Sequence, residues 1–327
     1  MTAVDTTTGV YEVLAETAGM ERDEWLAARR KGIGGSDAAA IVGVDTYRST
    51  FEVWLDKTGA PVDHDDQSEP AYWGTRLEDI VREEVHLRTG HDIVPDKKLL
   101  ASLQRPWQLA NLDGWVHDRA TDEIGVYEGK TAGYWAGQEW EADEVPDTYL
   151  LQGMHYLAVT GAPWLVYGVL IGGQRLEIRR VDRDQELIDH LITIEADFWA
   201  HVVEKVPPPV DGSKACTDLL AHMWDVKPDA VVTLDAGEVV PILNERALLV
   251  EEINAAETRK TELENQLKLL INEHEVAIDG DGRQLFTWKW IEQSRLDGTA
   301  LRESHPDLAE AFTKTSGYRR LYIPKGA

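Results

Sequence analysis

The longest unbroken apolar run in this chain, Trp164–Ile171, has only the length of a buried strand. A membrane-spanning helix would need about 20 consecutive apolar residues, and no run approaches that length. Gly172-Gly173 follows the run, and Gln174–Val181 comes next with strand-like composition, which predicts a β-hairpin. We therefore expect a globular protein with this hairpin in its sheet and no membrane segment.

Further strands and helices are predicted on both sides of the hairpin. Gln108–Val116 and Ile124–Thr131 are typical of strands joined by a polar turn. Helical spacing occurs at Glu21–Arg30, Ala38–Val42, Phe51–Lys57, Thr75–Thr89, Asp147–Val159 and Gln185–Glu204. This order predicts an α/β (α+β) fold, with a mixed central sheet flanked by helices.

Pro207-Pro208-Pro209 ends this block of the sequence. We predict a core domain at 1–206, a linker at 207–241 and a C-terminal extension at 242–327. The extension is expected to contain one long helix, Arg246–Val276. Its residues Leu249, Ile253, Leu263 and Leu267 have the spacing of an apolar stripe that packs against another helix, a helix seam. A strand at Arg283–Ile291 and a short helix at Gly298–Thr313 are predicted next. The basic tail from Phe312 carries Lys314, Arg319, Arg320 and Lys325.

Composition limits the chemistry that the chain can support. Cys216 is the only cysteine, which excludes intrachain disulfides and thiolate metal sites, so oxygen or imidazole ligands must hold any metal. The net charge of −26 disfavours tight nonspecific coating of DNA, although binding depends on local charge. The N-terminus lacks the basic and apolar regions of a secretory signal, so we expect a cytoplasmic protein.

Three acids and a lysine lie at suggestive places around the predicted sheet. Glu78 lies on a predicted helix, Asp113 at the end of one strand, and Glu128 on the next strand. Because side chains alternate along a strand, Glu128 and Lys130 are expected to share a face. Asp113 and Glu128 could hold Mg²⁺, and Lys130 could orient or deprotonate a water or stabilise a charged transition state.

Each of these residues also has a purely structural interpretation. Glu78 stands three residues after Thr75, which is the spacing of a helix capping box. Asp113-Gly114 is also typical of a turn, and Glu128 with Lys130 is also typical of a surface ion pair. The spacing by itself does not decide between the two interpretations.

The helix predicted after Asp147 carries Tyr149, Gln152 and Tyr156 on one face. That stripe could contact phosphate or position Lys130, or it could be a half-exposed helix surface. We expect His155 to lie on the helix surface.

The glycine-rich loop G-I-G-G-S, Gly32–Ser36, opens a helix for which Ser36 is a candidate N-cap. Its free amides and Arg29 could instead bind an anion together.

These segments together resemble the YqaJ-type viral recombinase family, phage exonucleases of the restriction-endonuclease-like, PD-(D/E)XK nuclease superfamily that are related to bacteriophage lambda exonuclease. The resemblance covers about residues 20–205. The matching segments are Arg29–Gly43, Phe51–Gly59, Gly74–Glu78, Leu112–Gly114, Glu128–Lys130 and the Q-x-x-x-Y pair of Gln152 and Tyr156.

The resemblance implies a restriction-endonuclease-like core and a Mg²⁺-dependent exonuclease, in which Mn²⁺ can substitute. Such an enzyme digests one strand of double-stranded DNA 5′ to 3′ and leaves a 3′ overhang for a phage single-strand annealing protein. The family often forms rings, so a homo-oligomer, for example a trimer, is implied. The expected setting is a bacterial host that carries the phage.

The resemblance also implies roles for individual residues. Asp113 and Glu128 are the implied metal ligands, with the Gly129 carbonyl as a third. Lys130 is the implied catalytic lysine, and Glu78 is the helical acid that helps a second metal or its waters. Gln152 and Tyr156 would support the active site, and Arg29 and Ser36 would bind the 5′-terminal phosphate.

Two other functions remain open from the sequence. The chain could be an endonuclease of the same superfamily, or a nonenzymatic DNA-associated assembly protein whose acids are structural. The long interval from Asp113 to Glu128 and the strong negative charge both depart from the simplest nuclease pattern.

Overall fold

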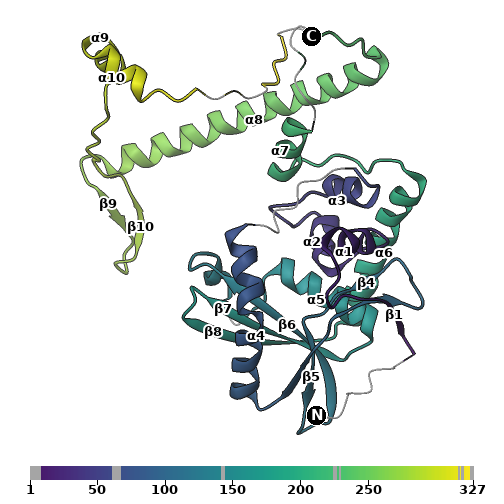
Figure 1. Cartoon of the computed structure of the whole chain (residues 1–327). Coiled ribbons are helices and arrows are strands. Elements are labelled where there is room, and N and C mark those ends of the chain that lie inside the picture. The colour runs from purple at the N-terminus through teal and green to yellow at the C-terminus, as the bar shows by residue number, and fades with distance from the viewer. Residues whose placement is uncertain are drawn as a thin grey trace. The chain divides into compact units, whose positions relative to one another are not determined.

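A computed structural model describes residues 9–60, 68–140, 144–223, 227, 230–315, 317 and 320–324. Contacts divide the chain into two units, Met1–Trp224 and Asp225–Ala327, which we describe separately (Figure 1). Among the described residues, no helix combines the length and the apolar character that crossing a membrane requires.

The first unit is built on a five-stranded sheet in the order β2-β5-β6-β7-β8 (Figure 1). The strands are β2 (Asp92–Pro95), β5 (Gly114–Asp118), β6 (Glu123–Ala132), β7 (Trp164–Ile171) and β8 (Arg175–Asp182). Only β6 and β7 pair in parallel, because α5 (Asp147–Thr160) connects them as a crossover. The predicted mixed sheet and the β7–β8 hairpin are confirmed.

Helices cover both faces of this sheet, as the predicted fold class requires. On one face, Val81 and Val85 of α4 (Glu69–Thr89) pack against Tyr127 and Val166. On the other face, α5 and α6 (Gln185–Glu204) bury a core that includes Val126, Leu165 and Tyr167. Neighbouring strand residues thus point to opposite cores, as strand geometry dictates.

A second, smaller sheet and three short helices complete the framework of the site. The sheet runs β1-β3-β4, with β1 (Tyr11–Glu16), β3 (Lys98–Ser102) and β4 (Leu109–Ala110). The helices are α1 (Arg22–Arg29), α2 (Gly35–Val42) and α3 (Thr50–Lys57). Ile33, in the loop before α2, forms a parallel bridge with Gln108, which attaches the glycine-rich loop to this sheet.

Two predicted elements around the site have wrong boundaries. The helix predicted from Thr75 begins at Glu69, with Ser68 as N-cap, so Glu78 lies in its interior and the capping-box interpretation of Glu78 is wrong. The strand predicted at Gln108–Val116 is interrupted, because β4 belongs to the small sheet and β5 to the large one. Asp113 therefore lies in the connection between two sheets.

The segment predicted as a linker, 207–241, contains α7 (Lys214–His222) and the first residues of α8. Ser213 caps α7 by accepting a hydrogen bond from the Cys216 amide, and Cys216 is buried. Residues 224–226 and 228–229 of this segment lie outside the described residues.

The second unit consists of a long helix, a small hairpin and two short helices. α8 (Ala236–Ile271) begins before the predicted Arg246 because Asp235 caps it, and its seam leucines are exposed. β9 (Val276–Ile278) and β10 (Gln284–Thr287) pair antiparallel, so Val276 is in a strand and not in the helix. Pro306 divides the last predicted helix into α9 (Gly298–Ser304) and α10 (Pro306–Ala311). Arg319 and Lys325 of the basic tail lie outside the described residues.

His155 is fully buried, so its predicted place on the helix surface is wrong. Its Nδ1 lies 2.6 Å from Glu195 Oε1 and its Nε2 lies 2.9 Å from the Leu109 carbonyl oxygen. Because both ring nitrogens face acceptors, the imidazolium form satisfies both contacts. Burial by itself lowers the pKa of His155, but Glu195 more than offsets this and raises the pKa above its ordinary value.

We expect the stability that this pair contributes to depend on pH. A histidine whose pKa is raised on folding stabilises the fold fully below its unfolded pKa of about 6.5, and the contribution disappears as pH rises through the folded pKa. Urea unfolding should therefore show wild type losing stability relative to a His155→Gln/Glu195→Gln variant as pH increases above neutrality. Parallel stability–pH curves for the two proteins would contradict the prediction.

Candidate active site

The register of β5 and β6 brings Asp113 and Glu128 together. Gly114 pairs with Tyr127 in this antiparallel ladder, so Asp113, one residue earlier, lies opposite Glu128, one residue later. Asp113 Oδ2 accepts a hydrogen bond of 2.8 Å from the Gly129 amide. Both acids line the same two cavities. The long interval between them in the sequence is taken up by β5, its turn and the first half of β6.

Glu128 and Lys130 lie on the same face of β6, as predicted. Lys130 Nζ donates a hydrogen bond of 2.9 Å to Glu128 Oε1 and lies 5.3 Å from the centre of the Tyr149 ring. The side chains of Lys130 and Glu128 are 21% and 4% exposed, so this is not the alternative surface ion pair. The pair lies on the face that α5 covers.

Gln152 and Tyr156 of α5 hold the Glu128 carboxylate in place. Gln152 Nε2 donates to Glu128 Oε1 at 2.8 Å and to the Tyr156 hydroxyl oxygen at 3.1 Å. The Tyr156 hydroxyl donates to the Asn111 carbonyl oxygen at 3.2 Å. Because both side chains are buried, the half-exposed surface considered for this stripe is wrong for them. Gln152 thus contacts Glu128 directly, and Tyr156 contacts it through Gln152.

The second oxygen of Glu128, Oε2, is buried and has no hydrogen-bond partner among the residues that the structure describes. Burial and the nearby Asp113 charge raise the pKa of Glu128 despite the adjacent Lys130. Burial likewise raises the pKa of Asp113. Burial lowers the pKa of Lys130, but Glu128 and Asp113 more than offset this effect and raise it, so Lys130 is a cation. Two close carboxylates and an unsatisfied oxygen form an electrostatically costly arrangement that a bound cation would relieve.

These residues fit a hard divalent cation. Mg²⁺ and Mn²⁺ prefer oxygen ligands, and Mg²⁺ commonly takes one or two carboxylates together with waters and substrate phosphate oxygens. Asp113 and Glu128 supply two carboxylates, and Gly129 lines the same cavity. Among the described residues, no three histidine, cysteine, aspartate or glutamate side chains group closely enough to hold a metal by themselves. The pair, and not a closed cage, is therefore the candidate metal site.

Glu78 lies across this cavity from the pair. It projects from the middle of α4 into a space of about 300 Å³ that Asp113, Glu128 and Lys130 also line. Its Oε1 accepts a hydrogen bond of 3.1 Å from Lys97 Nζ. The structure thus places Glu78 in the wall of the same cavity, outside the facing pair.

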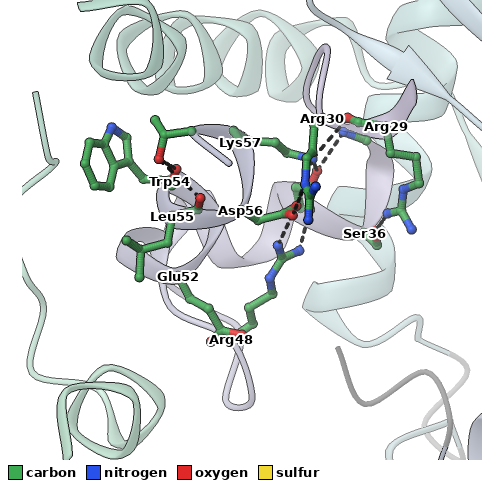
Figure 2. Close-up of polar contacts among 12 residues, drawn as sticks. Arg29, Arg30, Ser36, Arg48, Glu52, Trp54, Leu55, Asp56 and Lys57 are labelled. Atoms are coloured by element: carbon green, nitrogen blue, oxygen red, sulfur yellow. Dashed lines mark hydrogen bonds and ion pairs between the residues drawn. The ribbon is translucent and has the colours of Figure 1, made fainter. Parts of the chain in front are cut away.

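Arg29 and Ser36 meet in the other cavity that the two acids line. Arg29 Nη2 donates a hydrogen bond of 2.6 Å to Ser36 Oγ (Figure 2). Ser36 is inside α2, whose N-cap is Gly34, so the interpretation of Ser36 as the N-cap is wrong. Both residues line a cavity of about 250 Å³ that also contacts Asp113 and Glu128. An anion there would face a guanidinium and the amides of a helix N-terminus.

The two cavities share Asp113 and Glu128, and the Tyr156 ring lines the smaller one. A Cβ atom at Gly35 would lie 2.5 Å from Tyr156 Cε1, so only glycine allows α2 to begin against this ring. The same tyrosine accepts from Gln152, which holds Glu128. The glycine-rich loop and the acids are therefore positioned by one side chain.

Trp25 and Asn111, which no sequence motif indicated, also line the smaller cavity. Trp25 Nε1 donates to Asn111 Oδ1 at 3.1 Å, and the Arg29 guanidinium lies 4.6 Å from the centre of the Trp25 ring. Helical spacing could have revealed Trp25, because it precedes Arg29 by one turn of α1. Nothing local to Asn111 indicates its partner on a distant helix.

The chain belongs to the YqaJ-like viral recombinase family, whose family model matches residues 24–163. All the site residues described above lie inside that range. A Bacillus subtilis (strain 168) relative named "Uncharacterized protein YqaJ" is 36% identical over 316 residues, covering 95% of this chain and 97% of the relative.

Solved structures similar to this chain cover a little more than half of it. An alkaline exonuclease from Laribacter hongkongensis aligns with a TM-score of 0.47 and 22% identity, over 56% of this chain and 94% of that one. A phage-related exonuclease from Haemophilus somnus 129PT aligns with a TM-score of 0.40 and 9% identity, over 53% of this chain and 96% of that one.

Proposed function

We propose that this protein is a Mg²⁺-dependent deoxyribonuclease, a 5′-to-3′ exonuclease that degrades one strand of linear double-stranded DNA. The observation that carries the proposal is the pair of facing carboxylates, Asp113 and Glu128, with the ammonium of Lys130 2.9 Å from one of them. The product would be a 3′ overhang, suited to phage recombination by single-strand annealing. The family's description as viral recombinases supports that role.

The proposed chemistry divides between the two carboxylates and the lysine. When bound, a divalent cation would supply charge neutralisation on the scissile phosphate and activation of a water. Asp113 and Glu128 would hold it, with the Gly129 carbonyl as a third ligand. Gln152 and Tyr156 keep the Glu128 carboxylate oriented by the hydrogen bonds they make. Glu78 would bind waters on the far side of the cavity.

Lys130 acts in this proposal as a cation and not as a base, because its pKa is raised by the acids beside it. Its ammonium would donate a hydrogen bond to an oxygen on which negative charge develops in the transition state. Tyr149, whose ring faces the ammonium, limits where that group can move. The residue thus contributes electrostatic stabilisation at a fixed point.

The cavity at Arg29 would bind the 5′-terminal phosphate of the strand being degraded. It opens onto the acids, so a terminal phosphate held there would bring the adjoining phosphodiester toward them. Binding a terminal group next to the reacting bond is what limits a nuclease to chain ends. A ring-shaped homo-oligomer, for example a trimer, and a phage annealing protein are the partners that this activity would use.

End-labelled linear duplex and covalently closed circular DNA test the proposal together. With Mg²⁺, or with Mn²⁺ in its place, we expect one strand of the linear duplex to shorten from its 5′ end and the circle to remain intact. Cleavage of the circle would indicate an endonuclease. Absence of cleavage and of heat on titration with either metal would indicate a nonenzymatic DNA-associated assembly protein.

We expect Arg29→Gln to reduce the preference for 5′-phosphorylated ends. A charge-assisted hydrogen bond contributes about 1.5–3 kcal/mol, so kcat/KM on phosphorylated ends should fall on the order of 10- to 100-fold. The rate on 5′-hydroxyl ends should change little. Arg119→Gln is the matched control, because Arg119 pairs with Asp92 at an exposed edge of the sheet. Equal losses on both kinds of end would exclude a phosphate pocket at Arg29.

A further inference from the structure

A cluster of five charged residues, three of them buried, lies next to the glycine-rich loop (Figure 2). We name it the Asp37 cluster; it consists of Arg30, Asp37, Arg48, Asp56 and Lys57. Asp37, in the first turn of α2, is fully buried and has three donors. Its Oδ1 accepts from Arg48 Nη1 at 2.5 Å, and its Oδ2 lies 2.7 Å from Lys57 Nζ and accepts from the Gly34 amide at 2.9 Å.

The α3 members of the cluster connect it to the end of α1. Lys57 has a side chain only 1% exposed, and its Nζ donates to the Arg29 carbonyl oxygen at 3.3 Å. Asp56 accepts from Arg30 Nε at 3.2 Å and from Arg48 Nη2 at 3.4 Å. Three helices are thereby fixed to one another at the point where their ends meet.

Two of these contacts act directly on the cavity at Arg29. Lys57 holds the Arg29 backbone, and Asp37 holds the amide of Gly34, which lines the cavity. The Arg29 guanidinium and the α2 amides can face one anion only if α1 and α2 keep this relative placement. Three of the cluster's five charges are positive, so the carboxylate behind the loop is compensated and does not repel an anion in front of it.

The electrostatics agree with a cluster that keeps its charges in the folded protein. Burial by itself raises the pKa of Asp37, but Lys57, Arg48 and Arg29 outweigh this and hold it well below its usual range. Asp37 is therefore ionised throughout the neutral pH range. Removing one partner would leave buried charge without compensation, which would displace the remaining side chains.

We propose that Asp37 and Lys57 are positioning residues for the terminal phosphate, which set the preference for phosphorylated DNA ends by holding Arg29 and the Gly34 amide. The inference rests on the proposed function, because it takes the cavity at Arg29 as the phosphate site. The inference goes beyond the proposed function by assigning the selectivity for DNA ends to buried side chains that would not contact the DNA. If the cluster only stabilised the fold, substitutions in it would weaken the binding of phosphorylated and unphosphorylated DNA ends equally.

The test measures Kd for duplexes that differ only in a 5′ phosphate or a 5′ hydroxyl, by fluorescence anisotropy without divalent metal. The selectivity ratio is the Kd of the 5′-hydroxyl duplex divided by the Kd of the 5′-phosphorylated duplex. We expect Lys57→Met and Asp37→Asn to reduce this ratio about tenfold, because a loosened pocket loses charge-assisted contacts to the phosphate. Binding of the 5′-hydroxyl duplex should change less than about twofold. With Mg²⁺, the same selective loss should appear in KM and not in kcat.

Two further variants keep the result interpretable. Arg30→Gln removes a partly exposed member of the cluster, so it should fold and should reduce the ratio by about threefold. Leu191→Ala is the control for destabilisation, because it opens a cavity in the main core and removes none of the polar contacts of the cluster. It should lower the melting temperature and leave the ratio unchanged.

The outcomes separate this inference from the proposed function. If Arg29→Gln lowers the ratio while every folded cluster variant keeps the wild-type ratio, the inference is overturned and the phosphate pocket stands. If wild type itself does not distinguish the two duplexes, the phosphate pocket fails and the inference fails with it. If Leu191→Ala lowers the ratio as much as Lys57→Met does, general destabilisation explains the effect and the inference is overturned.

Discussion

Lys130→Met should slow strand degradation about 10³-fold while leaving DNA binding nearly intact. Removing one group that stabilises transition-state charge in a buried site typically costs about 10²–10³-fold in rate. We expect the upper end of that range. The ammonium is held between Glu128 and the Tyr149 ring, so a water molecule would not readily take its place in the variant. Single-turnover degradation of end-labelled duplex measures the loss directly.

A matched lysine variant shows whether the effect is local. Lys214→Met removes an exposed lysine of α7 that pairs with Asp218, outside the cavities described here. It should keep the wild-type rate, since exposed ion pairs contribute only about 0–1 kcal/mol. A rate for Lys130→Met within tenfold of wild type would remove this lysine from the mechanism.

Asp113→Asn should have opposite effects on activity and on stability. Activity should fall on the order of 10³-fold, because one of the two carboxylates that would hold the cation is lost. The metal-free protein should become more stable near neutral pH. Burial raises the pKa of Asp113, so its ionised form costs stability above its unfolded pKa, and asparagine removes that charge. The amide oxygen of asparagine can still accept from the Gly129 amide.

Melting curves with and without Mn²⁺ measure both parts of this expectation. Ligand at about 100 times its Kd stabilises a protein by about 2.7 kcal/mol, so wild type should melt at a higher temperature when Mn²⁺ is added. Asp113→Asn should show little of that shift. Asp92→Asn, which changes a half-buried aspartate of β2 paired with Arg119 outside the site, should behave like wild type. A full Mn²⁺ shift in Asp113→Asn would show that the cation does not bind at this pair.

Features that depend on neighbouring residues were predictable from the sequence. Ser49 caps α3 by accepting from the Glu52 amide, as its spacing indicates. Gly161 ends α5 in the left-handed conformation, with φ of 72°. α6 has the predicted bounds, because its apolar periodicity is uninterrupted between Asp184 and the proline run.

The predictions for polar side chains were wrong where more than one hydrogen-bond partner was available to the side chain or to the helix end. Thr75 and Glu78 have capping-box spacing, but Ser68 caps the helix further upstream and the Thr75 hydroxyl donates to the Ala71 carbonyl. His155 looks like a surface residue by composition, yet Glu195 on another helix pairs with it in the core. Polar residues are buried when a distant partner satisfies them, and a single segment does not reveal that partner.

The amino-acid sequence alone determined which segments are helices and strands, and it put Glu128 and Lys130 on one face, because these properties follow from backbone periodicity over a few residues. Only the tertiary structure decided that Asp113 faces Glu128, that Gln152 holds this acid, and that Lys57 anchors Arg29. Those contacts join residues far apart in the chain, and their geometry depends on strand register and helix packing, which no local pattern specifies.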